Sequence, residues 1–181
     1  MSFTWTKLSD SESGPEINFR RITYYDGSLY THVKDHMYIY NLNTSSWTSI
    51  IPKGESDFDI YFHNQCIYEG SLYLIKGIDI YKIDLSNHRY EVQEISIPKE
   101  GMAELSSGYD CVENQVYIFG GDSVSNGFFN TLSIIDLSSQ NLEFQILTNN
   151  MNVPTARRGH AMEAYNDKLY IFGGVDGNKK R

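Results

Sequence analysis

The chain has 181 residues, and 23 Asp and Glu against 15 Lys and Arg give it a net charge of -8. No cluster of basic residues stands out before the last few positions, so neither nucleic acid nor an anionic membrane is an expected partner. No apolar run approaches the roughly 18 residues of a membrane span, and the first residues carry no secretory segment. The two cysteines, Cys66 and Cys111, suit a reducing compartment, and we expect the cytoplasm or the nucleus.

The sequence repeats itself four times, each time around a tyrosine. The segments are TYYDGSLY ending at Tyr30, CIYEGSLY at Tyr73, CVENQVY at Tyr117 and EAYNDKLY at Tyr170, spaced by 43, 44 and 53 residues. In each segment an apolar run meets a short polar turn, and a second apolar run follows. Gly and Asn tolerate the positive φ of tight turns, so each segment is predicted to be a β-hairpin of strands a and b. In the first repeat these strands are expected near Ile22–Tyr25 and Leu29–His32.

Two further strands follow each complete hairpin. Strand c, expected near Met37–Leu42 in the first repeat, ends in Asn41-Leu42, Asp84-Leu85 or Asp136-Leu137. The Asn or Asp side chain there can bond its own backbone and begin a turn. Strand d carries an aromatic residue, which is Trp47, Tyr90 or Phe144. Four antiparallel strands with this period are typical of a β-propeller blade, so the predicted fold class is all-β, with helix nearly absent.

The repeats predict a single domain over residues 1–181, with repeats at about 15–50, 60–95, 105–147 and 154–181. The stretch Trp5-Thr6-Lys7-Leu8 resembles Trp47-Thr48-Ser49-Ile50, so residues 3–8 are predicted to be a leading closure strand. The fourth repeat supplies strands a and b alone, and we expect an incomplete propeller. Such a blade would leave the edge at Leu169–Phe172 unpaired, and self-association through that edge is expected.

Repeats three and four carry a more specific pattern. Repeat three reads Val116-Tyr117-Ile118-Phe119-Gly120-Gly121, and repeat four reads Arg157-Arg158-Gly159-His160 and then Leu169-Tyr170-Ile171-Phe172-Gly173-Gly174. This resembles the kelch repeat, whose marks are a double Gly ending strand b, a Tyr before it, and an Arg and a Gly-His leading into strand a. Repeats one and two depart from the pattern, with Thr31-His32 and Ile75-Lys76 in place of the double Gly, and short b–c hairpins are predicted there.

Most residues of this motif are expected to be structural. Gly120-Gly121 and Gly173-Gly174 permit positive φ and close backbone approach, and no Lys-Ser or Lys-Thr follows them to make a phosphate loop. The repeat tyrosines, Tyr117 and Tyr170 among them, are predicted to pack between blades. Trp47 is the aromatic mark of its strand d, and His160 is predicted to pack or hydrogen-bond at a blade edge. Cys66 and Cys111 hold near-equivalent places in strand a and are expected to be buried, inert thiols.

A binding face follows from the alternating strand directions. The b–c and d–a loops lie on one face, and the d–a loops differ from one another, as binding loops on a rigid scaffold do. The longest b–c loop, residues 122–129, contains Phe128 and Phe129, and exposed aromatics near an Arg are usual anchors of protein interfaces. The candidate partner contacts are Asp122, Phe128, Phe129 and Arg157. Alternatively, the two phenylalanines fold back onto the blade.

One pattern points to metal chemistry. Glu55, Asp59 and His63 are spaced by four, and carboxylates with an imidazole suit iron or another divalent metal. By resemblance, plant specifier proteins are kelch proteins that bind iron with such residues, but no other part of their pattern is evident. No motif assembles a copper site of the galactose oxidase type, and no nucleophile is placed beside a base. We therefore expect no metal, no cofactor and no catalysis.

The function that the resemblance implies is a non-catalytic protein-interaction scaffold, or a fragment of one, that presents loops to a protein partner as an adaptor does. Two alternatives stay open. One is a metal-dependent kelch enzyme of the specifier or galactose oxidase type. The other is a non-functional product of a truncated gene.

Overall fold

The structure is a computed structural model that describes residues 21–33, 35–54, 64–76, 79–94, 108–123, 127–147 and 153–177. All regular structure in these ranges is β-strand, as the all-β prediction required. Because the same ranges contain no helix, they contain none long and apolar enough to cross a membrane. The predicted leading strand at residues 3–8 lies outside them and stays a prediction.

Three four-stranded antiparallel sheets form the first three blades. Blade 1 contains β1 (Thr23–Tyr25), β2 (Ser28–Val33), β3 (His36–Asn41) and β4 (Ser46–Ile50). Blade 2 contains β5 (Asn64–Tyr68), β6 (Ser71–Lys76), β7 (Asp79–Asp84) and β8 (Arg89–Glu94). Blade 3 contains β9 (Gly108–Val112), β10 (Gln115–Phe119), β13 (Leu132–Asp136) and β14 (Phe144–Ile146), with β11 (Asp122–Ser123) paired to β12 (Gly127–Phe128) in its b–c loop. In blade 4, β16 (Ala161–Tyr165) pairs with β17 (Lys168–Phe172), and β15 (Arg157–Arg158) pairs with β18 (Val175–Asp176).

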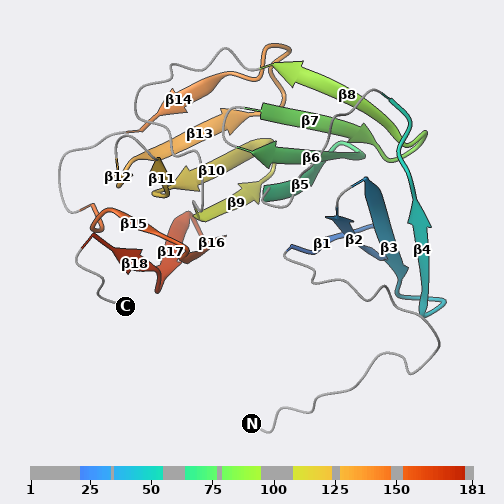
Figure 1. The fold of residues 1–181 in the computed structure, drawn as a ribbon, viewed down its shortest axis with the longest axis horizontal. Coiled ribbons are helices and arrows are strands. Elements are labelled where there is room, and N and C mark those ends of the chain that lie inside the picture. The colour runs from blue at the N-terminus through green and yellow to red at the C-terminus, as the bar shows by residue number, and fades with distance from the viewer. Residues whose placement is uncertain are drawn as a thin grey trace, which may run out of the picture.

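The blades are arranged in an arc around their first strands. Strand a of each blade contacts strand a of the next, in the order β1, β5, β9 and β16. Figure 1 shows these four strands on the inner side of the arc, with β4, β8 and β14 on its outer side. We call the four first strands the inner strands. This is the propeller arrangement that the repeat period predicted.

The a–b turns have the conformation that their residues favour. Asp26 and Gly27 have φ values of 42° and 72°, and Glu69 and Gly70 have values of 45° and 70°. Two successive positive φ values make a type I′ turn, whose twist matches that of the flanking strands. The turn after strand c also forms as expected, because Asn41 Oδ1 accepts hydrogen bonds from two backbone N–H groups that follow it, each at 2.9 Å.

The hydrophobic core lies between blades, because alternate residues of a strand face opposite neighbours. In β6, Leu72 and Leu74 are fully buried in one cluster with Met37 of blade 1. Tyr73, between them, is 4 % exposed and packs in a second cluster with Val116 of blade 3. Because both sides of β6 are buried, its sequence is apolar at successive positions. Each blade therefore depends on both of its neighbours to bury its side chains.

The predicted packing of the repeat tyrosines is wrong at blade 4. Tyr73 is buried and Tyr30 packs against the cluster between blades 1 and 2, but Tyr170 is 53 % exposed. Phe172, two residues further along β17, is 83 % exposed. The reason is that no described residue of another blade covers this face, whereas blade 3 covers the equivalent face of blade 2.

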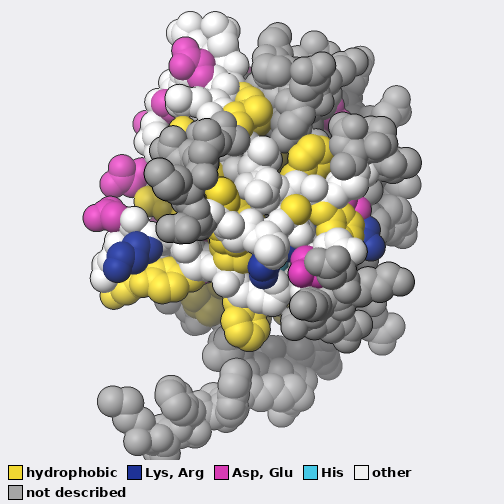
Figure 2. Space-filling model, turned by 90° about the vertical axis from the view of Figure 1, so that its left-hand side faces the viewer, with side chains coloured by type: hydrophobic (Ala, Val, Ile, Leu, Met, Phe, Trp, Pro, Cys, Tyr) yellow, Lys and Arg dark blue, Asp and Glu magenta, His cyan; other side chains and the backbone are white. Residues whose placement is uncertain are grey.

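We call the side of the β16–β17 pair that carries Tyr165, Tyr170 and Phe172 the open face. The strand register places Glu163 opposite Tyr170, so these side chains share one side of the sheet, while Met162 on the other side is buried. Figure 2 views the molecule from the side that carries β15 to β18, and hydrophobic side chains reach the surface there. Lys168 lies on the same side, so the face carries three exposed aromatic side chains beside two charged ones. Exposed aromatic side chains grouped in this way favour association.

We expect the 181-residue chain to self-associate through the open face, because a whole blade covers the equivalent side of blade 2. Phe172→Ser should move the chain toward the monomer in size-exclusion chromatography with light scattering. Ile51→Ser is the matched control, because Ile51 is another exposed hydrophobic residue, at 61 %, that follows β4 in blade 1. A wild-type chain that runs as a clean monomer and melts sharply would contradict this expectation.

Candidate partner-binding face and central pocket

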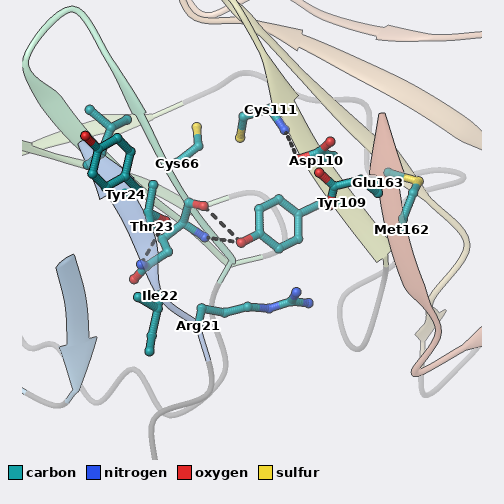
Figure 3. Close-up of a pocket in the computed structure, with 12 residues that line it drawn as sticks. Arg21, Ile22, Thr23, Tyr24, Cys66, Tyr109, Asp110, Cys111, Met162 and Glu163 are labelled. Carbon is teal, nitrogen blue, oxygen red and sulfur yellow. Dashed lines mark hydrogen bonds between the residues drawn. The ribbon is translucent and has the colours of Figure 1, made fainter. Parts of the chain in front are cut away.

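The inner strands of all four blades line a cavity of about 390 Å³, which we call the central pocket. Arg21 precedes β1, Tyr109 and Asp110 lie on β9, and Glu163 lies on β16 (Figure 3). These residues give the pocket one cationic and two anionic side chains beside an aromatic ring. The pocket lies where four separate segments meet, which is a usual place for ligand sites.

Buried hydrogen bonds join the inner strands of blades 1, 2 and 3. The Tyr109 hydroxyl donates to the Gln65 carbonyl at 2.9 Å and accepts from the Gln65 N–H at 3.2 Å, as the dashed lines in Figure 3 mark. The Gln65 side-chain Nε2 donates to Thr23 Oγ1 at 3.0 Å and to the Tyr30 carbonyl at 2.9 Å. Gln65 is 2 % exposed, so these bonds satisfy polar groups that would otherwise be buried without partners.

Asp110 joins blade 3 to blade 4 in the same way. Its Oδ2 accepts a hydrogen bond from the Ala164 N–H at 2.6 Å, and its Oδ1 accepts one from the Cys111 N–H at 2.8 Å. Together with the Gln65 and Tyr109 contacts, these bonds connect all four inner strands, and we call them the inner-strand links.

Tyr109 is held in its protonated form. Burial raises the pKa of Tyr109 to about 12, although the Gln65 hydrogen bond and the Arg21 charge both lower it. The Arg21 guanidinium carbon lies 4.6 Å from the centroid of the Tyr109 ring, which is a cation–π contact. The hydroxyl therefore stays a hydrogen-bond donor across the physiological pH range.

His160 packs between blade 4 and blade 3. It is 5 % exposed, and its ring meets the Phe119 ring edge-on with centroids 5.6 Å apart. A Cβ atom at Gly108 would lie 2.2 Å from His160 Nε2, and one at Gly120 would lie 2.6 Å from the Arg157 carbonyl oxygen. The double Gly of blade 3 therefore permits close approach of the next blade, in addition to the φ of 64° at Gly120. The predicted packing role of His160 at a blade edge matches this position.

The predicted partner contacts come together where blade 3 meets blade 4. We define the loop cluster as Asp122, Phe128, Phe129, Arg157 and Arg158. Arg158 Nη1 donates to Asp122 Oδ2 at 2.6 Å, and its guanidinium carbon lies 5.1 Å from the centroid of the Phe128 ring. The Arg158 side chain is 49 % exposed and the Asp122 side chain 14 %, so the pair presents its cation to solvent.

Arg157 and Arg158 have different roles, which the sequence did not separate. Arg157 Nε and Nη2 donate to the carbonyl and hydroxyl of Thr155, and Nη1 donates to the Gly173 carbonyl at 2.9 Å. Its guanidinium therefore links the segment before β15 to the segment after β17, both in blade 4. Arg158 is the more exposed of the two arginines. The sequence analysis named Arg157 as the partner contact, which stays a prediction, and did not name Arg158.

Phe128 and Phe129 are both half-buried. This burial is intermediate between the two predicted alternatives, which were exposed interface anchors and rings folded back onto the blade. The Phe129 N–H donates to the Gly121 carbonyl, and its own carbonyl accepts from the Arg157 N–H. At Gly174, a Cβ atom would lie 2.8 Å from the Arg158 carbonyl oxygen, so the double Gly of blade 4 permits close approach of the β15 backbone within that blade.

The remaining candidate residues lie away from this junction. Trp47 is half-buried and meets the Tyr40 ring at 5.0 Å, and the Tyr117 hydroxyl donates to Gln115 Oε1 at 2.6 Å. The weak metal candidates Glu55, Asp59 and His63 lie outside the described residues. Within the described ranges, no three His, Cys, Asp or Glu side chains are grouped so that they could hold a metal ion.

The comparison with protein families decides the identity of the repeats. The family model described as the KLHDC2/KLHL20/DRC7 Kelch-repeats domain matches residues 76–181, which is more than half of the chain. The chain belongs to the kelch-repeat family. This confirms the resemblance of repeats three and four, and the match also includes β7 and β8 of blade 2.

Two curated kelch relatives come from yeasts. Tip elongation aberrant protein 1 of Schizosaccharomyces pombe is 27% identical over 157 residues, and Kelch repeat-containing protein 2 of Saccharomyces cerevisiae is 27% identical over 143 residues. The matches cover 80% and 77% of this chain but 14% and 12% of the relatives. Among solved structures, YjhT superposes with a TM-score of 0.68 at 14% identity, over 86% of this chain and 58% of that chain. That likeness supports the propeller fold.

Tyr109→Phe should destabilise the kelch repeats by about 1–3 kcal/mol, because it leaves the buried Gln65 N–H and carbonyl without their partner. Chemical unfolding measures the change. Tyr165→Phe removes a hydroxyl from a side chain that is 66 % exposed, and it should change stability by less than about 0.5 kcal/mol. Equal effects of the two variants would show that the inner-strand link contributes nothing.

His160 should make stability depend on pH. Burial lowers the pKa of His160, and the charges of Arg157 and Arg21 lower it further. An unfolded histidine has a pKa of about 6.5, so below that pH the unfolded chain binds more protons than the folded chain. The free energy of unfolding should therefore fall as pH drops below about 6.5 and through the lower folded pKa.

The measurement is urea unfolding of wild type and His160→Gln at about pH 7.5 and about pH 5. The difference between the two proteins should be larger at the higher pH, where the wild type keeps its neutral, buried imidazole. The same difference at both pH values would contradict the effect.

Proposed function

We propose that this kelch-repeat chain is a non-catalytic scaffold that binds a protein partner through its loop cluster. Membership in the kelch family supports the role of protein-interaction scaffold at a coarse level, as do the two kelch-repeat relatives. The loop cluster is the finer part of the proposal. It lies on the face of the b–c and d–a loops, which the alternating strands predicted as the variable face.

The observation that carries the proposal is the position of Arg158. Its guanidinium is fixed by Asp122 on one side and by the Phe128 ring on the other, while 49 % of the side chain remains exposed. A side chain that is already ordered loses little conformational freedom when a partner binds. Arginine and aromatic residues are also the types most enriched among the residues that dominate protein interfaces.

The chemistry of the cluster indicates the kind of partner segment. Phe128 and Phe129 offer half-buried apolar rings, and Arg158 offers donors that Asp122 does not fully occupy. A segment with an apolar side chain next to a carboxylate or carbonyl oxygen would satisfy both. Binding of this kind needs no catalytic group.

The experiment begins with affinity capture on the wild-type chain, followed by calorimetric titration of the purified partner. Phe128→Ala with Phe129→Ala should weaken binding by more than about 1 kcal/mol, and Arg158→Ala should do the same. Arg89→Ala is the matched control, because Arg89 is an exposed arginine at the start of β8, next to the c–d turn at the other end of the blades.

Wild-type affinity in both the double phenylalanine variant and Arg158→Ala would remove the loop cluster from the proposal. Arg157→Ala provides a further distinction. It should lower the melting temperature by breaking the contacts to Thr155 and Gly173, so its effect on binding should follow its effect on stability.

A further inference from the structure

The two cysteines of the chain lie next to each other, although they are 45 positions apart in sequence. Cys66 is on β5 opposite Tyr73, and Cys111 is on β9 opposite Val116. The two strands contact each other, both side chains line the central pocket, and Figure 3 shows the two sulfur atoms on facing sides of it. Both thiols are free. The predicted burial holds for Cys66, at 2 % exposed, whereas Cys111 is partly exposed.

We propose that Cys66 and Cys111 form an oxidation site, at which a small hydroperoxide converts the two thiols into a disulfide between β5 and β9. This site is distinct from the loop cluster and does not depend on the proposed partner. The bond would tie the inner strand of blade 2 covalently to that of blade 3.

The inner-strand links keep the two thiols together. Gln65 directly precedes Cys66, and Tyr109 lies two residues before Cys111. The hydrogen bonds of the Tyr109 hydroxyl to Gln65, at 2.9 and 3.2 Å, therefore fix the separation of β5 and β9 beside the sulfur atoms. Asp110 restrains Cys111 further by accepting its backbone N–H at 2.8 Å. Holding two reacting groups in one place raises their effective concentration.

The oxidation balances in two steps. One thiolate attacks the terminal oxygen of the hydroperoxide, the O–O bond breaks, and an alcohol leaves, which gives a sulfenic acid. The second sulfur then attacks the sulfenic sulfur, the S–O bond breaks, the S–S bond forms, and water leaves. The two thiols lose two hydrogen atoms in all, and the hydroperoxide is reduced to an alcohol and water.

The central pocket gives a small oxidant a route to both sulfur atoms, since Cys66 and Cys111 both line it. A hydrogen bond to Cys66, together with burial, raises the pKa of Cys111 well above its usual value. Because the thiolate is the reactive form, the reaction should be slow at neutral pH and should accelerate as pH rises.

The test treats the folded, fully reduced chain with hydrogen peroxide, alkylates the remaining thiols under denaturing conditions, and maps the peptides by mass spectrometry. The expected product is a chain without free thiols and without intermolecular disulfides, in which the Cys66 peptide is linked to the Cys111 peptide. In Cys66→Ser and Cys111→Ser the linked peptide must be absent. Two alkylatable thiols, sulfinic acids in place of the disulfide, or a disulfide-linked dimer as the main product would overturn the proposal.

A second measurement separates a preformed site from the pairing that any chain with two cysteines can show. The disulfide is equilibrated in glutathione redox buffers, once in native buffer and once in denaturant. The equilibrium constant for its formation should be at least about tenfold higher in the folded chain. Tyr109→Phe, which loosens β5 from β9, should reduce this advantage. An equal or smaller constant in the folded chain would show that the fold holds the thiols in a geometry unsuited to a disulfide.

Discussion

The structure depends on how the inner strand of one blade is attached to that of the next. An inner strand is the edge of its sheet, so half of its backbone polar groups face the centre without a partner in the sheet. At Gln65, one tyrosine hydroxyl from blade 3 binds both the N–H and the carbonyl, and the glutamine side chain then binds Thr23 and Tyr30 of blade 1. Hydrogen bonds are directional, so these contacts fix the relative position of blades that apolar packing alone would hold less specifically.

Two properties of the centre follow from this attachment. Residues next to the links, such as Cys66 and Cys111, are held at a set separation by bonds one or two positions away. Tyr109 also contacts the Arg21 guanidinium, so the residue that joins blades 2 and 3 forms part of the pocket wall. The same contacts therefore support the fold and shape a concave, polar region that the four inner strands share.

The junction of blades 3 and 4 depends on close approach. Gly108 and Gly120 leave space for the His160 ring and the Arg157 carbonyl. The Gly121 N–H donates to the Arg157 carbonyl, and the Arg157 N–H donates to the Phe129 carbonyl, so the Arg157 backbone is held on both sides. With its backbone fixed in this way, β15 directs one arginine to the Gly173 carbonyl and the other over the Phe128 ring. The residues of the kelch motif therefore act together here. Gly120, Gly121, Arg157 and His160 all take part in the contact between blades 3 and 4.

The sequence by itself determined the strands, the turns and the blade period, because those features depend on interactions within a few residues. Asp26-Gly27 needs no distant partner to form its turn, and the predicted strands of the first repeat lie within one residue of the observed bounds. The tertiary structure alone decided that Tyr170 is exposed while Tyr73 is buried, that Arg158 is more exposed than Arg157, and that the two thiols lie together. Each of these three features depends on which residues of another blade lie beside the side chain in question. Repeats with similar local sequences do not encode whether such a neighbouring blade is present.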